Sequence, residues 1–306
     1  MSDTPPRSKR QRWIWRIKVF LLLLVSVLLA LFYLAYPLYT AFLHTHPGHN
    51  LPDDSPADWD LPYEDVRLTT ADGLELAAWY IPPQNGAVII LLHGLGANRG
   101  YALSHATYLA EAGYGSLLVS VRAHGASDGD RYPLGRQAAV EDVLAALDFV
   151  QAQPDVEHIG GLGFSLGGIL LLQAAAQDER LEAVIADGPG GSTLDDLWLG
   201  TVWDYLMLPG YLVYLGGTRA LDGDDSEVVP VQSNLHQIAP RPVFLVAGGN
   251  DWAEVRGVER YYESVGAPKR YWEVPDAGHI GGYSRHPDEY ARRVLDFLDT
   301  AFFPAE

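Results

Sequence analysis

The apolar positions of the chain follow two patterns, one before and one after about residue 60. Residues 19–42 read VFLLLLVSVLLALFYLAYPLYTAF and contain no charged side chain. From residue 63 onward, short apolar runs of strand length alternate with longer segments whose apolar residues recur every three or four positions. The sequence therefore predicts an N-terminal apolar helix followed by an alternating α/β domain.

The alternating part begins with a hairpin. Apolar and polar residues alternate in segments 65–70 and 74–81, which flank the turn Ala71-Asp72-Gly73; this predicts two antiparallel strands. Residues 87–93 form a continuous apolar run, as in strands covered on both faces. Further strands are expected at 114–121, 158–164, 182–187, 242–248 and 269–274, and helices at about 100–113, 135–152, 166–177, 255–265 and 287–303. This order predicts a mostly parallel central sheet with helices on both faces.

The interval between Asp187 and Pro242 interrupts the alternation. It holds several Trp and Tyr residues and no strong strand pattern. A structureless loop of this length is unusual in a compact domain. We therefore expect a helical cap insertion at about residues 189–240, over the carboxyl edge of the sheet.

The apolar helix at residues 19–42 is long enough to cross the roughly 30 Å hydrocarbon core of a bilayer. Six basic side chains and one acid lie in residues 1–18, and basic residues are retained on the cytoplasmic side. We expect a basic cytoplasmic tail (1–18), a transmembrane signal anchor (19–42), a linker (43–62) and an extracytoplasmic domain (63–306). A cleaved secretory signal is the alternative, but no convincing cleavage site follows the apolar run.

The composition of the chain excludes some classes of partner and of catalytic group. The formal net charge is −18 and the sequence contains no cysteine. The acidic balance argues against a nucleic-acid partner, and the lack of cysteine excludes disulfides and a thiol nucleophile. Two clusters of side chains could suggest metal ligands: His44, His46 and His49 in the linker, and Asp222, Asp224, Asp225 and Glu227 in the cap insertion. Solvated loops are the more common explanation of such clusters, so neither a metal nor a cofactor is expected.

Ser165 is the one polar side chain in the run GGLGFSLGG, residues 160–168. It lies where the strand ending near Phe164 meets the helix beginning near Leu166, at the sheet edge where α/β proteins bind ligands. Gly163 and Gly167 lack Cβ atoms and would let the strand turn directly into the helix, with the hydroxyl exposed. The alternative is an N-cap serine with glycines for packing.

A serine nucleophile needs a base and an orienting acid. The turn after the strand 242–248 carries Asp251, and the turn after the strand 269–274 carries His279. We predict Ser165 as nucleophile, His279 as base and Asp251 as acid, because the strand ends would converge on one point. Asp187 is a less favoured alternative acid, and His124 is expected to brace its loop.

A second glycine-rich turn, HGLGANR at residues 93–99, follows the strand that ends near residue 92. The backbone N–H groups of Leu95 and Leu166 could together stabilise a developing oxyanion. His93 is expected to brace this loop.

These segments resemble the α/β-hydrolase superfamily, most of all serine hydrolases of the Bem46-like and S9/S33 peptidase-like kind, over residues 63–303. The motifs are LLHGLGANR, VRAHGASDG, GLGFSLGG, VAGGNDW, DAGHIGG and the final helix EYARRVLDFLDTAF. Matched to them, Ser165, His279 and Asp251 form the triad, and the Leu95 and Leu166 amides form the oxyanion hole. The sequence departs from many lipases in having HGLG in place of HGGG.

Together with the anchor expected at residues 19–42, the resemblance implies a membrane-anchored serine hydrolase that cleaves an ester, in preference to an amide, through an acyl-enzyme. Its partners would be a small-molecule acyl substrate, with a lipid-like one as a candidate, and the membrane through residues 19–42. An acyltransferase on the same triad and a non-catalytic scaffold or receptor of the same fold are the alternatives. The sequence does not indicate an oligomeric state.

Overall fold

A central sheet organises the chain, which the computed structural model describes at residues 8–198 and 200–304. These residues form an eight-stranded sheet of order β1-β2-β4-β3-β5-β6-β7-β8. The strands are β1 (Glu64–Thr69), β2 (Glu75–Ile81), β3 (Ala87–Leu92), β4 (Gly115–Val119), β5 (His158–Phe164), β6 (Ala183–Asp187), β7 (Val243–Gly248) and β8 (Lys269–Val274). β2 pairs antiparallel with β1 and β4, and the other pairs are parallel. The predicted hairpin and mostly parallel sheet are confirmed.

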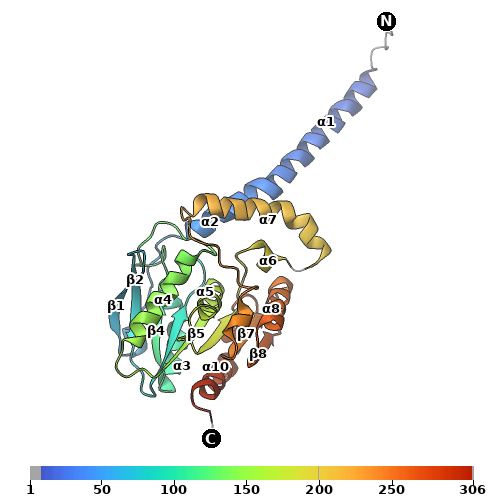
Figure 1. Ribbon diagram of the computed structural model, residues 1–306. Coiled ribbons are helices and arrows are strands. Elements are labelled where there is room, and N and C mark those ends of the chain that lie inside the picture. The colour runs from blue at the N-terminus through green and yellow to red at the C-terminus, as the bar shows by residue number, and fades with distance from the viewer. Residues whose placement is uncertain (1–7, 199, 305–306) are drawn as a thin grey trace.

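Helices cover both faces of the sheet (Figure 1). The long ones are α3 (Leu103–Glu111), α4 (Gln137–Gln151), α5 (Leu166–Ala175), α8 (Trp252–Ser264) and α10 (Pro287–Phe302). Alternate residues of β3 belong to two separate cores: Val88, Ile90 and Leu92 pack with α4, α5 and α8, and their neighbours pack with α3 and α10. All of β3 is buried, which explains its continuous apolar sequence.

The insertion between β6 and β7 is helical, as expected. It contains α6 (Leu194–Leu197), α7 (Val202–Leu221) and the short η4 (Leu235–Ile238). α6 and α7 lie beyond one edge of the sheet, and α7 runs beside the base of the N-terminal helix (Figure 1). The other short helices are η2 (Pro56–Trp59), η3 (Arg99–Ala102) and α9 (Gly282–Arg285).

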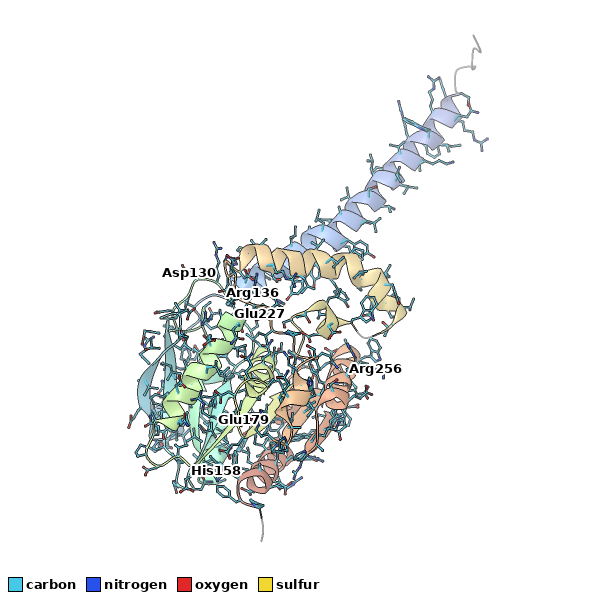
Figure 2. The ribbon with its side chains drawn as sticks, in the orientation of Figure 1. Asp130, Arg136, His158, Glu179, Glu227 and Arg256 are labelled. Atoms are coloured by element: carbon cyan, nitrogen blue, oxygen red, sulfur yellow. The ribbon has the colours of Figure 1, made fainter. Side chains whose placement is uncertain are left out.

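The N-terminal helix is continuous from Lys9 to Thr45 and is therefore longer at both ends than the apolar span of residues 19–42. It comprises α1 (Lys9–Ala30), a π-helical turn η1 (Leu31–Ala35) and α2 (Tyr36–Thr45). Ser8 starts it with a capping box, so the described part of the basic tail is helical, while residues 1–7 lie outside the described residues. The helix is long and apolar enough to cross a membrane, and the side chains of α1 project away from the domain (Figure 2).

The predicted linker is attached to the domain. Its first residues belong to α2, and the Nδ1 atom of His44 lies 2.8 Å from the Tyr214 hydroxyl of the cap. Both ring nitrogens of His49 lie 3.0 Å from carbonyl oxygens, those of Gly125 and Gly129. These two histidines therefore have separate partners on the domain.

A buried ion pair holds the loop after β4. The Arg122 side chain is 4% exposed, and its Nε donates to Asp142 of α4 at 2.7 Å. Its Nη1 donates to Asp72 of the hairpin turn at 2.7 Å, and its carbonyl accepts a hydrogen bond from His124. One guanidinium thus joins the hairpin, α4 and a loop that reaches the sheet edge.

We predict that Arg122→Met lowers the free energy of unfolding by about 3–5 kcal/mol, because it leaves the Asp142 carboxylate buried without its partner. The measurement is a urea titration of the full chain in detergent. Arg256 of α8 (Figure 2) is the matched control, since it pairs with Glu259 at the surface and its side chain is 54% exposed. Arg256→Met should cost less than about 1 kcal/mol. Equal, small losses in both variants would contradict this account.

Candidate active site

Ser165 occupies a strained turn between β5 and α5. Its φ of 52° lies in the left-handed region, which a residue with a Cβ rarely adopts. A Cβ on Gly163 would lie 2.3 Å from the backbone of Gly167, and one on Gly167 would lie 2.3 Å from the Leu92 carbonyl oxygen. Both glycines are therefore required for the strand to turn directly into the helix.

The structure brings His279 to Ser165. The His279 Nε2 atom lies 2.9 Å from the Ser165 Oγ atom, although the two residues come from the turns after β8 and β5. The imidazole is partly open to solvent, with 48% of the side chain exposed. The predicted nucleophile and base are thus within hydrogen-bonding distance.

Asp251, the predicted acid, is not hydrogen-bonded to His279. It is the N-cap of α8, and its carboxylate accepts the N–H groups of Ala253 at 3.0 Å and Glu254 at 3.1 Å. The carboxylate at the His279 Nδ1 atom is instead that of Glu254, at 2.5 Å and with 5% of its side chain exposed. The sequence prediction is corrected here: the first acid after the strand caps the helix, and the longer acid one turn inside it reaches the histidine.

The sequence contained a signal for this arrangement. A residue of the Ser, Thr, Asp or Asn type followed three positions later by Glu is typical of a helix start. Starting the predicted helix at Val255 placed Glu254 in the turn, whereas α8 begins at Trp252 and includes it.

Asp187, the alternative acid, serves another purpose. It is buried at the end of β6, where its carboxylate accepts the Tyr290 hydroxyl at 2.9 Å and its carbonyl accepts the Ser165 N–H at 2.8 Å. Burial raises the pKa of the Asp187 carboxyl to about 7. Asp187 therefore positions the backbone of the turn that carries Ser165.

Glu254 also sets the basicity of His279. Its hydrogen bond and its charge raise the pKa of the imidazole above the ordinary 6.5, against the opposing effect of burial, and the charges of Asp187 and Asp251 add to the increase. With Nδ1–H donated to Glu254, the Nε2 atom is free to accept the Ser165 proton.

The loop after β3 lies against the serine. A Cβ on Gly94 would lie 3.5 Å from the Ser165 Cβ. Leu166 begins α5, so its N–H has no partner within the helix, and no hydrogen-bond partner of the Leu95 N–H is found among the described residues. The predicted oxyanion hole requires amides without partners, and the role of these two amides stays a prediction.

Two buried histidines brace that loop. His93 Nε2 accepts the Val121 N–H at 3.2 Å, and His124 Nε2 accepts the Gly96 N–H at 3.1 Å. Burial lowers the pKa of His93 to about 3 and that of His124 to about 4, so both are neutral acceptors at pH 7. The bracing roles expected from the sequence agree with these bonds.

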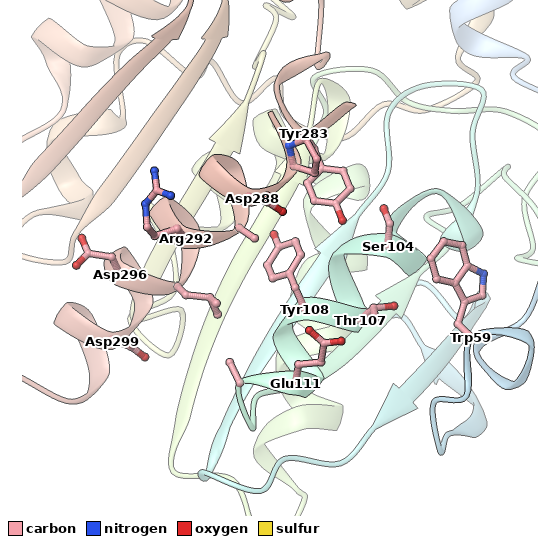
Figure 3. Close-up of a pocket in the computed structure, with 14 residues that line it drawn as sticks. Trp59, Ser104, Thr107, Tyr108, Glu111, Tyr283, Asp288, Arg292, Asp296 and Asp299 are labelled. Atoms are coloured by element: carbon pink, nitrogen blue, oxygen red, sulfur yellow. The ribbon is translucent and has the colours of Figure 1, made fainter. Parts of the chain in front are cut away.

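A cavity of about 260 Å³ adjoins the candidate triad and is lined by His279, Glu254, Leu197 and Tyr211, among others. A larger groove of about 770 Å³ lies between α3 and α10, with Glu111, Asp288 and Asp296 on its walls (Figure 3). His279 lines the smaller cavity and is not among the residues that line the larger groove. The cavity beneath the cap is therefore the candidate substrate site.

Known proteins share this fold. Residues 87–229 match a family model described as alpha/beta hydrolase fold. An alpha/beta hydrolase domain-containing protein of Arabidopsis thaliana is 30% identical over 260 residues, which cover 80% of this chain and 81% of that protein. An esterase of Pyrococcus furiosus has a TM-score of 0.68 at 24% identity and covers 84% of this chain and 98% of its own. At that identity the esterase structure shows the fold alone.

A polyketide transferase of Stachybotrys chlorohalonatus is also similar. It is 38% identical over 138 residues, which are 44% of this chain and 46% of the transferase. The chain thus spans about half the length of that relative.

We predict that Glu254→Gln lowers kcat/KM by about 10³–10⁴-fold, because an amide no longer fixes the His279 tautomer or stabilises the imidazolium. Asp251→Asn should stay within about threefold of the parent, because Asn is as good an N-cap as Asp. Turnover of an activated ester by both purified variants checks this. The reverse order of effects would restore Asp251 as the acid.

A pH profile tests the electrostatics independently. The base must be neutral to accept the serine proton, so kcat/KM should rise with pH through the His279 pKa, with a midpoint above 6.5. In Glu254→Gln the principal cause of the raised pKa is removed, so the midpoint of the residual activity should move to lower pH. An unchanged midpoint would show that Glu254 does not act on the base.

Proposed function

The chain belongs to the α/β-hydrolase superfamily, and on that premise we propose that it is a membrane-anchored serine hydrolase that cleaves an ester through an acyl-enzyme. The observation that carries this proposal is the position of the His279 ring, 2.9 Å from the Ser165 Oγ on one side and 2.5 Å from Glu254 on the other. A serine hydroxyl is a weak nucleophile until such a base accepts its proton.

In the first half of the reaction, His279 Nε2 takes the proton from Ser165 as the oxygen attacks the ester carbonyl carbon. The negative charge that develops on the carbonyl oxygen is stabilised by the Leu95 and Leu166 N–H groups. His279 then gives its proton to the leaving alkoxide, the carbon–oxygen bond of the substrate breaks, and the acyl group remains on Ser165.

In the second half, water takes the place of the alcohol. His279 removes a proton from the water as it attacks the acyl-enzyme, and the same two amides stabilise the second oxyanion. Collapse of this intermediate releases the acid and returns the proton to Ser165. Glu254 holds the ring in one orientation throughout and stabilises its protonated form.

The N-terminal helix supports the membrane part of the proposal. It carries the basic residues Lys9, Arg10, Arg12, Arg16 and Lys18 at its start and an uncharged apolar stretch after them. Because basic flanks are retained in the cytoplasm, the N-terminus would be cytoplasmic and the hydrolase domain extracytoplasmic.

An acyltransferase is the second candidate, and the similarity to the polyketide transferase favours it. An alcohol would take the place of water at the acyl-enzyme, with the same residues in the same roles. The two activities differ only in which nucleophile reaches the acyl-enzyme.

We predict that the full chain in detergent hydrolyses p-nitrophenyl esters and that Ser165→Ala reduces kcat by at least about 10³-fold. The full chain is required because α2 contacts the cap through His44 and Tyr214. Equal turnover by parent and variant would defeat the proposal. Addition of an alcohol acceptor distinguishes the two candidates, because a transferase forms a new ester at the expense of the free acid.

A further inference from the structure

A second cavity lies between the cap and the N-terminal helix. It has a volume of about 420 Å³, and its walls include Phe32, Tyr33 and Tyr36 on one side and Leu197, Met207 and Tyr211 on the other. This volume is within the usual range for small-molecule sites. The apolar lining suits a hydrocarbon chain better than a polar ligand.

This cavity shares walls with the one at the candidate triad. Gly191, Leu197 and Tyr211 line both cavities, and His279 and Glu254 line the cavity at the candidate triad. The two cavities therefore adjoin each other, one at the N-terminal helix and the other at His279.

The N-terminal helix is packed in place as part of this wall. Pro37, Ala41 and Thr45 are the buried residues of α2 and recur every four positions, so they form one face. α7 approaches this face closely: a Cβ on Gly217 would lie 3.0 Å from the Ala41 Cβ. The helix that could span the membrane therefore shapes the cavity directly.

Large apolar side chains are exposed beside the cavity, among them Phe32, which also lines it. Val202, Trp203 and Leu206 of α7 are 77%, 62% and 49% exposed, and Phe32 on the neighbouring helix is 50% exposed. α7 lies beside the base of α1 (Figure 1). A membrane spanned by α1 would meet the N-terminal end of α7, where Val202, Trp203 and Leu206 lie. Aromatic side chains such as Trp203 favour the boundary between lipid and water.

We propose that the passage formed by these two cavities binds the hydrocarbon chain of a membrane lipid ester, which enters from the bilayer between α7 and the N-terminal helix. The ester carbonyl would then reach Ser165, and the polar part of the lipid would leave through the solvent-exposed side of His279. This inference rests on the proposed serine hydrolase activity and adds to it the substrate class and the route of entry.

The test compares short and long acyl chains in variants that narrow the passage. The full chain is placed in phosphatidylcholine vesicles and assayed with p-nitrophenyl acetate and p-nitrophenyl decanoate. Leu197→Trp narrows the passage from the cap, and Thr40→Trp narrows it from the N-terminal helix. Leu212→Trp is the control. It also replaces Leu with Trp, but at a position of α7 that is 54% exposed and does not line the cavity.

The expected result is that Leu197→Trp and Thr40→Trp each lower the decanoate-to-acetate ratio of kcat/KM by at least about tenfold, while Leu212→Trp leaves it unchanged. The passage is overturned if the ratio is unchanged in Leu197→Trp and Thr40→Trp, or if each of these variants loses acetate and decanoate turnover equally. In that case acetate turnover by the parent still supports the hydrolase. Parent activity no greater than that of Ser165→Ala on either ester overturns the hydrolase and this inference with it.

Discussion

The bridge that His279 makes between Ser165 and Glu254 is the interaction on which the chemistry of this protein depends. Ser165 and His279 lie in the turns after β5 and β8, and Glu254 lies in the first turn of α8, which follows β7. These segments are separated in the sequence and meet because parallel strands end at one edge of the sheet. The central strands β3, β5, β6 and β7 are almost entirely buried, so they hold the turn that carries Ser165 rigidly. The strained backbone of Ser165 is tolerated for the same reason.

The sequence predicted most of the fold because its local signals agree with one another. Continuous apolar runs indicated strands covered on both faces, and the spacing of Gly163 and Gly167 indicated a turn that a Cβ would block. The acid was harder to predict because two carboxylates, Asp251 and Glu254, follow the same strand and one must cap the helix. Which carboxylate binds the backbone N–H groups of α8 and which binds His279 depends on how far each side chain reaches in three dimensions. A linear sequence pattern does not contain this information.

The relation between the N-terminal helix and the cap also lay beyond the sequence. The sequence predicts a transmembrane anchor at residues 19–42 and a linker at residues 43–62. In the structure α2 instead packs along α7, with Pro37 and Ala41 buried between them, and His44 contacts Tyr214. Long-range packing of this kind makes the candidate membrane segment a wall of the cavity that adjoins the one at the triad.

The most direct test of the central claim is covalent labelling of the full chain with an alkyl fluorophosphonate, followed by mapping of the modified residue by tandem mass spectrometry. The account predicts one modified site, Ser165, with labelling lost in His279→Ala and slowed in Glu254→Gln. Modification of a different serine, or labelling of Ser165 that is equally fast without His279, would contradict it.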